Sequence, residues 1–163
     1  MASAARPDIR LNIVGDGSEL ADLKEIAERE SIRGIVFWGR RPQSDMPAFF
    51  RASDVMVISL LDDPIFALTV PAKFQAYLAF SKPIFAVIKG DVRDMVESRG
   101  LGLYAPPESP EAIRDGFLRF RETPPAALKD FSRNAGELLR TVYAREKVVA
   151  GMTELLRDAA EKS

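Results

Sequence analysis

Five short apolar runs, each followed by a segment of helical periodicity, limit the fold of this chain more than any other feature. The runs cover residues 11–14, 35–38, 55–60, 83–88 and 102–105. They do not alternate with polar residues, which is typical of parallel strands covered on both faces. Parallel neighbours need a crossover of a dozen or more residues, and the helical segments supply it. The sequence therefore predicts an α/β fold with about five parallel strands.

The C-terminal part of the chain is helical only. Pro124 and Pro125 mark a break, and the apolar positions between Leu138 and Leu156 predict a long C-terminal helix that packs back across the domain. A chain of 163 residues with 47% hydrophobic content suits one compact core. No repeat, low-complexity segment or internal linker divides it, so we expect a single domain over residues 1–163.

The composition excludes several functional classes. The chain has no cysteine and no histidine, which removes disulfides, thiol nucleophiles and histidine acid–base catalysis, and we expect no metal site. Lys and Arg total 23 against 24 Asp and Glu, so no overall field attracts nucleic acid. No apolar run approaches the roughly 18 residues that span a bilayer, and residues 1–6 lack the apolar core of a signal peptide. We expect a cytoplasmic protein.

Lys73 is the most informative single residue. The other expected helix starts carry acids, which favour the positive end of a helix by about 0.3 to 1 kcal/mol, whereas Lys73 opens its helix with a cation. A lysine there is favourable when an anion, most simply a phosphate, docks against the free backbone N–H groups. The alternative is that Lys73 extends into water at a small energetic cost. In the same segment Thr69 is expected as the N-cap, and Phe74, Tyr77 and Leu78 are expected to pack on the sheet.

Other candidates follow the carboxyl ends of the expected strands, where open parallel sheets bind ligands. Gly15 and Gly17 form a turn suited to phosphate, but the third glycine of the dinucleotide fingerprint is replaced by Leu20, and a plain turn capped by Ser18 is the alternative. Asp62 and Asp63 follow the third strand, where a solvated turn before Pro64 is the alternative.

Arg40 and Arg41 follow the second strand, where a guanidinium can bind a phosphate or a base. An exposed basic turn is the alternative. Phe37 and Trp38 lie within the preceding apolar strand, so we expect both in the core.

Taken in order, several segments resemble the C-terminal half of a group 1 glycosyltransferase. They are residues 11–17, 36–40, 52–55, 71–83, 90–91 and 100–107. The resemblance covers nearly the whole chain and implies a Rossmann-like three-layer domain of GT-B architecture that holds a UDP- or GDP-sugar. It further implies transfer with retention and without a required metal or other cofactor.

The resemblance also assigns roles to individual residues. The helix of residues 72–80 approaches the diphosphate and ribose of the donor, with Lys73 and the N–H groups near Thr69 and Val70 at the phosphates and Gln75 at the ribose. Gly15 and Gly17 contribute backbone N–H groups, Arg40 borders the base, Asp63 lies at the rim, and Gly90 and Asp94 are weaker candidates for the sugar. No catalytic residue is assigned.

Two departures from the family pattern stand out. The two glutamates that the family carries eight positions apart are replaced by Leu68 and Ala76, although the version here resembles a subgroup associated with surface polysaccharides and aminosugar transfer. The chain also starts after the family's first strand and helix, and it lacks the N-terminal acceptor domain. The resemblance thus implies a fragment of a larger enzyme, which is inactive alone and self-associates through apolar strand edges.

The full enzyme is expected to transfer a hexosyl group to a glycan or lipid-linked acceptor, held by the missing domain, in capsule or lipopolysaccharide synthesis peripheral to the inner membrane. Two alternatives stay open. One is a sugar-nucleotide epimerase of the same architecture, and the other is a non-catalytic α/β interaction module.

Overall fold

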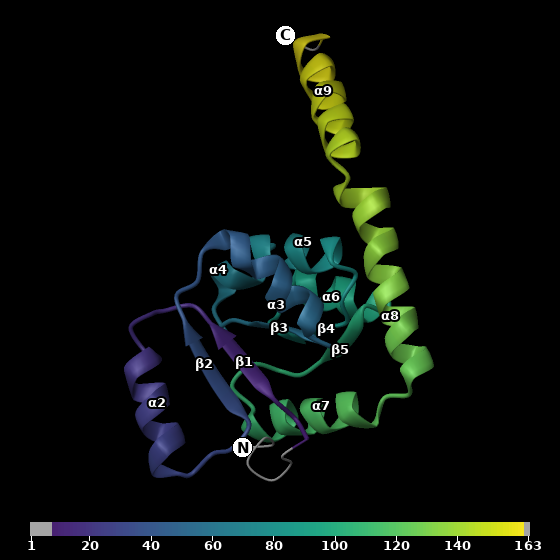
Figure 1. The fold of residues 1–163 in the computed structure, drawn as a ribbon. Helices are drawn as coiled ribbons and strands as arrows, with labels where there is room; N and C mark the ends of the chain where they lie inside the picture. Colours follow the sequence, from purple (N-terminus) through teal and green to yellow (C-terminus); the bar gives the residue numbers. More distant parts are fainter. Residues whose placement is uncertain (1–7, 162–163) are drawn as a thin grey trace.

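All five predicted strands are present in the computed structural model, which describes residues 8–161 (Figure 1). They are β1 Leu11–Val14, β2 Ile35–Gly39, β3 Met56–Ser59, β4 Ile84–Val87 and β5 Gly102–Tyr104. The helices between them are α2 Leu20–Arg29, α3 Met46–Ala52 with the preceding 3-10 turn η1 Gln43–Asp45, α4 Pro64–Ala67, α5 Ala72–Ala79 and α6 Asp91–Ser98. The chain ends with α7 Pro110–Glu122, α8 Pro125–Leu138, the π-helical turn η2 Leu139–Tyr143 and α9 Arg145–Glu161. The predicted α/β Rossmann-like class is confirmed.

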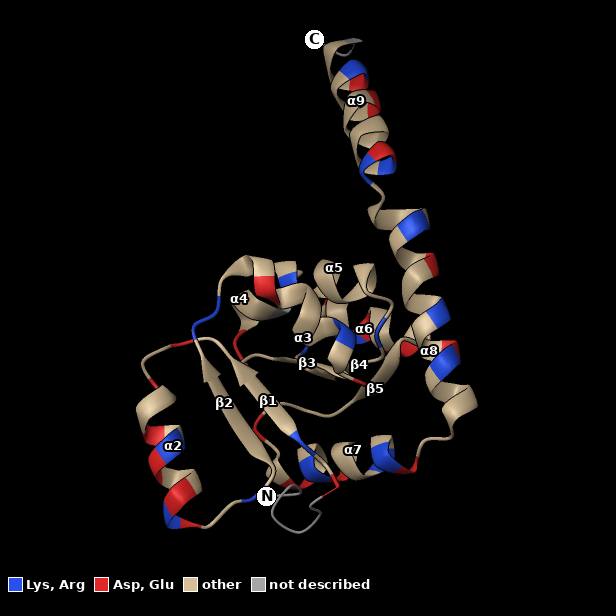
Figure 2. Ribbon diagram, in the orientation of Figure 1, with Lys and Arg blue, Asp and Glu red and all other residues tan. Residues whose placement is uncertain are grey.

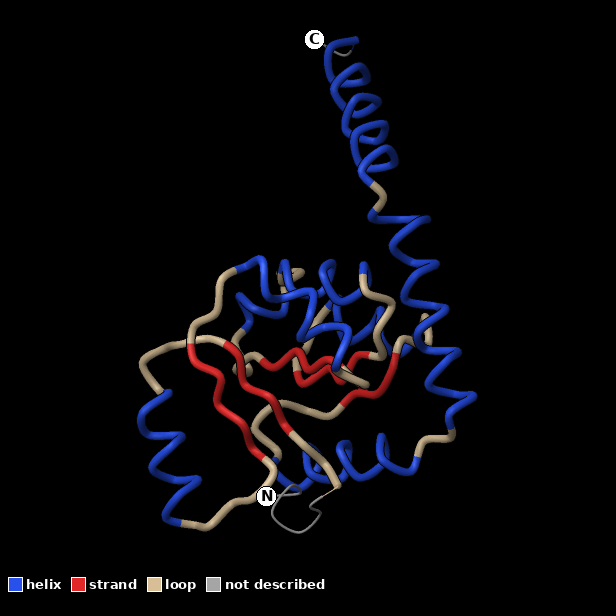
Figure 3. The backbone as a smooth tube through the Cα atoms, viewed as in Figure 1, coloured by secondary structure: helices blue, strands red, loops and turns tan. Residues whose placement is uncertain are grey.

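The strands are parallel but form two separate sheets. β1 pairs with β2 in one sheet, and the other has the order β3-β4-β5, so the strands appear as two groups (Figure 3). In the first sheet Leu11 lies opposite Ile35, and the register shifts by one residue between Ile13 and Val14. In the second sheet the register is regular, with Met56 opposite Ile84. The sequence predicts the strands correctly but not this division of the sheet.

The hydrophobic core surrounds the three-stranded sheet only. Helices α5, α6 and α8 pack on one of its faces, with Phe74 and Leu78 of α5 fully buried as predicted, and α7 packs on the other around Phe85. Every residue of β4 is buried. Within residues 8–55, by contrast, no residue is buried. The expectation that all strands are covered on both faces is therefore wrong for β1 and β2.

Trp38 illustrates this difference. Its side chain is 40% exposed, and its indole N–H donates a hydrogen bond to the Asn12 side chain at 3.0 Å. Phe37 is half-buried. The prediction that Trp38 belongs to the core is wrong, because the sheet to which it belongs has no fully covered face.

Two connections hold the sheets together. On one face, Phe49 of α3 packs edge-on against Trp38 at 5.2 Å, and Phe50 packs against Tyr77 of α5 at 5.5 Å. On the other, Arg121 of α7 forms an ion pair with Asp8, which precedes β1. Helix α3 thus joins β2 to the layer that covers β3, while α7 joins the start of β1 to the opposite layer.

The C-terminal helix differs from the prediction. Instead of one long helix that packs back, the π-helical turn η2 and Ala144 separate α8 from α9, and α9 extends away from the domain (Figure 1). Its apolar positions Val148, Val149, Met152, Leu155 and Leu156 are 45–71% exposed. The apolar spacing predicts an amphipathic helix, but the described residues offer it no surface to cover.

Tyr77 provides a test of the packing between α3 and α5. Burial raises the pKa of its hydroxyl above the ordinary 10.0. The folded protein keeps this proton at a pH where the unfolded chain has begun to lose it, so the free energy of unfolding falls as the pH rises through about 10. We expect Tyr77→Phe to reduce this alkaline loss, measured by urea unfolding at about pH 8 and about pH 11. Equal losses in both proteins would contradict the burial of this hydroxyl.

Candidate functional site

The carboxyl ends of the strands carry two ion pairs that lie in neighbouring loops. After β1 and β2, Arg40 Nε contacts Asp16 Oδ2 at 2.9 Å, and both side chains are at least half exposed. After β3 and β4, the Lys89 ammonium contacts the Asp62 carboxylate at 2.5 Å. The loops at these strand ends carry charges of both signs (Figure 2). A charged rim of this kind can bind a polar ligand at the carboxyl edge of a parallel sheet.

Lys73 lies in the first turn of α5, as predicted. Its side chain is exposed, and it forms no hydrogen bond or ion pair with any residue in the range 8–161. The first turn contains no acid, and Phe74 and Leu78 of the same helix are buried in the core. Lys73 thus lies at a helix N-terminus without a counter-charge from the described residues. This arrangement favours the binding of an anion.

The segment before α5 differs in detail from the prediction. Pro71 is the N-cap of α5, and the Thr69 hydroxyl donates instead to the Phe66 carbonyl at 2.9 Å, so the N-cap role expected of Thr69 is wrong. Val70 is half-buried against the core, and Gln75 is exposed one residue from Phe74. Thr69 therefore closes α4, while α5 begins without a side-chain cap.

Asp63 already has a structural role. Its carboxylate accepts a hydrogen bond from the Ile65 N–H at 2.7 Å and caps α4. The preceding residue, Asp62, forms the ion pair with Lys89. The backbone N–H of Asp62 donates to the Glu108 side chain at 3.4 Å. Of the two neighbouring acids, the structure directs Asp62 rather than Asp63 toward the other strand ends.

The glycine turns occupy their expected positions. Gly15 has φ +139°, and its N–H donates to the Gly39 carbonyl at 2.9 Å, which fixes the loops after β1 and β2 beside each other. Gly17 follows in the same turn. The Ser18 hydroxyl donates to the Glu19 side chain and does not cap the helix, so the alternative of a plain turn capped by Ser18 is wrong in that detail. The first two strand ends thus form one continuous surface.

At the end of β4, Gly90 is the N-cap of α6 with φ +81°, a left-handed conformation that favours glycine. Asp94 is exposed in the first turn of α6. Both residues therefore follow Lys89 closely in the sequence, at the same strand end as the Asp62–Lys89 ion pair.

Sequence reasoning missed Lys89. The hydrogen bond that the Lys89 ammonium group donates to the Asp62 carboxylate raises the pKa of Lys89, which therefore stays charged at neutral pH. A signal was available, because Lys89 directly follows the fourth apolar run, as Asp62 follows the third. The rule that ligands bind beyond strand ends applies to both positions.

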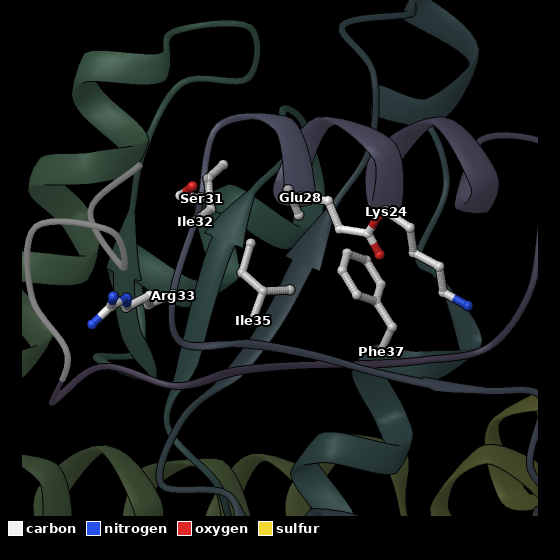
Figure 4. A pocket seen from close by; sticks show the side chains of 8 residues that line it. Lys24, Glu28, Ser31, Ile32, Arg33, Ile35 and Phe37 are labelled. Atoms are coloured by element: carbon white, nitrogen blue, oxygen red, sulfur yellow. The ribbon is translucent and has the colours of Figure 1, made fainter.

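An open cavity of about 430 Å³ lies elsewhere, between α2 and β2 (Figure 4). It is lined by Lys24, Ala27, Glu28, Ser31, Ile32, Arg33, Ile35 and Phe37. Residues 31–33 precede β2, so the cavity lies at the amino end of that strand, away from the charged rim. The cavity exists because α2 covers the two-stranded sheet only in part.

Two kinds of feature are absent from residues 8–161. No three acidic side chains there are grouped so that they could hold a metal ion. In the same range, none of the helices combines the length and the apolar character that a membrane span requires.

Several known proteins are similar to this chain. The probable glycosyltransferase WbjE of Pseudomonas aeruginosa is 28% identical over 102 residues, which are 61% of this chain and 25% of WbjE. Sucrose-phosphate synthase of Thermosynechococcus elongatus superposes with a TM-score of 0.81 at 20% identity over 99% of this chain and 41% of its own. HepE of Anabaena, solved in complex with UDP-glucose, superposes with a TM-score of 0.79 at 18% identity over 96% of this chain and 43% of its own. The chain thus spans less than half the length of each.

The family comparison is more specific than these likenesses of fold. The family described as "Glycosyl transferases group 1" matches residues 1–122, which include all five strands and the charged rim. This chain belongs to the group 1 glycosyltransferases.

Proposed function

We propose that this chain is the donor-binding part of a longer glycosyltransferase that transfers a hexosyl group from a UDP- or GDP-sugar with retention. The observation that carries the proposal is Lys73, an exposed cation in the first turn of α5 with no partner among the described side chains. Family membership and the fold likeness to HepE, solved with UDP-glucose, support a nucleotide-sugar as the anion. The share of each relative that the chain spans supports a second, acceptor-binding part elsewhere in the polypeptide.

In this proposal the donor lies along the carboxyl rim of the sheets. Lys73 and the free N–H groups at the start of α5, beside Thr69 and Val70, neutralise the diphosphate. Gln75 hydrogen-bonds the ribose and Arg40 borders the base, while Gly15 and Gly17 offer backbone N–H groups. Stabilising the departing diphosphate and orienting the donor supply most of the catalysis, which is compatible with a chain without histidine.

The sugar end of the donor has fewer candidates. Gly90 and Asp94 start α6, and Lys89 beside them adds a cation that sequence reasoning did not include. Leu68, at one of the positions where the family carries glutamate, is 84% exposed, and Ala76, at the other, is half-buried. Neither offers a carboxylate to a sugar, so we propose that Asp94 and the Asp62–Lys89 pair bind its hydroxyls instead.

The cellular role is proposed from family membership and the likeness to WbjE. We propose that the enzyme works in the cytoplasm beside the inner membrane, on a glycan or lipid-linked acceptor of a surface polysaccharide. The likeness to WbjE supports a glycosyltransferase of this general kind. Neither a metal nor another cofactor is required in this scheme.

A titration tests the donor site. We expect UDP-glucose, UDP or a GDP-sugar to raise the melting temperature saturably, since a ligand at 100 times its dissociation constant adds about 2.7 kcal/mol. Lys73→Ala removes one charge-assisted contact, worth about 1.5 to 3 kcal/mol, and should weaken nucleotide affinity about 10- to 100-fold. Calorimetric titration of both proteins measures the difference.

The matched control is Lys129→Ala, which removes an exposed lysine of α8 instead. It should leave nucleotide affinity unchanged. Equal affinity in the Lys73→Ala protein, or the absence of any nucleotide-dependent shift, would contradict the proposed site and favour a non-catalytic module.

A further inference from the structure

Lys82 connects the turn after α5 to the end of α3. Its ammonium group donates to the Ser53 carbonyl at 2.6 Å and to the Arg51 carbonyl at 3.0 Å. Ser53 is the C-cap of α3, so both acceptors lie at the C-terminal end of that helix. The last carbonyls of a helix have no partner within it and carry the negative end of its dipole, which makes a cation a favourable partner. Lys82 therefore caps α3 from another part of the chain.

The backbone fixes the place from which Lys82 reaches α3. The Lys82 N–H donates to the Tyr77 carbonyl at 3.3 Å and the Ser81 N–H to the Leu78 carbonyl at 2.9 Å, with Ser81 at φ +50°. These two bonds and the left-handed residue form a Schellman motif at the end of α5. Pro83 follows and is buried directly before β4. The half-buried Lys82 thus extends from a well-defined point of the layer that covers the three-stranded sheet.

Aromatic contacts join the same two helices. Phe50 of α3 packs edge-on against Phe80 at 5.1 Å and against Tyr77 at 5.5 Å. The Arg51 guanidinium lies 5.7 Å from the centre of the Phe80 ring. Tyr77 belongs to α5, and Phe80 is the C-cap of that helix. Lys82 and Phe50 therefore attach α3 to the C-terminal end of α5.

α3 also controls the side of the molecule that carries Arg40. Phe49, next to Phe50, packs against Trp38 of β2 at 5.2 Å, so α3 lies between the two-stranded sheet and α5 (Figure 1). At its other end α3 continues directly from η1, and only residues 40–42 separate η1 from β2. Arg40 lies in this short connection. The position of α3 therefore determines where Trp38 and Arg40 lie relative to α5.

We propose that Lys82 is a positioning residue for the donor site. By holding α3 against α5, it sets the distance between Arg40, which follows β2, and Lys73, which lies in the first turn of α5. The inference rests on the proposed function, because it takes both cations to contact one nucleotide. A ligand that spans the two sheets needs both halves of its site in place, and a misplacement of about 1 Å can cost about 100-fold in the rate of a reaction.

Trp38 reports the position of α3 without any ligand, because it is the only tryptophan in the chain. Lys82→Met keeps the apolar stem of the side chain and removes the ammonium group. We expect acrylamide to quench Trp38 fluorescence more strongly in the Lys82→Met protein, and the emission to shift to longer wavelength, since the contact with Phe49 loosens. The ion pair of Asp8 with Arg121 also joins the two sheets, so the change is partial.

Two further variants are the controls for this measurement. Lys82→Arg keeps a cation with several N–H donors, so it should restore the original quenching of Trp38. Lys129→Met removes an exposed lysine of α8 and should leave the quenching unchanged.

A double-mutant cycle then separates positioning from a general loss of stability. Lys82→Met should weaken UDP binding about 10-fold in calorimetric titration. In an Arg40→Ala background the same change should cost about 3-fold or less, because the contact that Lys82 positions is already absent. In a Lys73→Ala background the loss should stay about 10-fold, because the other contacts of α5 and α6 still hold the nucleotide. A merely structural role of Lys82 gives equal losses in all three backgrounds.

Phe50→Leu keeps the test decisive if the Lys82→Met protein does not fold, because it loosens α3 from its aromatic contacts and should also expose Trp38. Unchanged quenching of Trp38 in the folded variants would overturn the inference. Equal losses of UDP affinity in the unchanged and the Arg40→Ala backgrounds would do the same. If UDP binds none of the proteins while Trp38 responds as expected, the proposed function fails, and the placement of α3 by Lys82 stands.

Discussion

Gly102→Ala is expected to destabilise the protein by about 3 kcal/mol or more. In β5, a methyl group at this position falls 1.9 Å from the carbonyl oxygen of Ile84, its partner in β4. A backbone atom cannot give way as a flexible side chain does, so the strands must separate and break the pairing at the centre of the core. Overpacking commonly costs about 1 to 3 kcal/mol, and a clash with backbone lies at or above the upper end of that range. Urea unfolding followed by circular dichroism measures the loss.

Gly151→Ala is the matched control. A methyl group there meets nothing within 4 Å, and Gly151 lies inside α9. Alanine in a helix interior is more favourable than glycine by up to about 1 kcal/mol, so stability should stay equal or rise slightly. A Gly102→Ala protein as stable as the Gly151→Ala protein would contradict the close approach of β4 and β5.

Phe85→Ala is expected to destabilise the protein by about 3 to 5 kcal/mol. Phe85 in β4 is fully buried, and its ring packs edge-on against Phe117 at 5.0 Å and Phe120 at 5.6 Å. Removing it leaves a cavity between the sheet and α7 that the surrounding aromatic rings cannot fill without moving. The free energy of unfolding in urea measures the effect.

The corresponding change in the smaller sheet is Phe37→Ala. Phe37 in β2 is half-buried and lines the open cavity beneath α2, so its removal should cost only about 1 kcal/mol. Similar losses for Phe37→Ala and Phe85→Ala would show that residues 8–55 share the main core, contrary to their burial in the structure.

The sequence predicts the order of the elements well, because local periodicity decides whether a segment becomes a strand or a helix. All five apolar runs contain strands, and a helix follows each of them. What failed depends on tertiary contacts, which local periodicity does not encode. Trp38 and the apolar face of α9 carry the pattern of buried residues, yet the described residues do not cover them.

The candidate site is predictable to a similar degree. Strand order places the loops with Gly15, Arg40, Asp63 and Gly90 at one edge, since parallel strands end on the same side. Which side chains meet there depends on loop geometry. Asp63 caps α4 through its own backbone turn, whereas Asp62 meets Lys89 from a loop 27 residues further along the chain. The roles assigned to Lys73 and Gln75 remain predictions until nucleotide binding is measured.

The π-helical turn η2 gives α9 a mechanical connection to the helix that carries Lys73. Tyr143, at the end of this turn, stacks edge-on with Phe74 at 6.1 Å, and its hydroxyl donates to the Met95 sulfur at 3.3 Å. Over residues 145–160 every residue is exposed except the half-buried Gly151. Tyr143 is thus the point at which the segment leading to α9 touches Phe74, the residue next to Lys73.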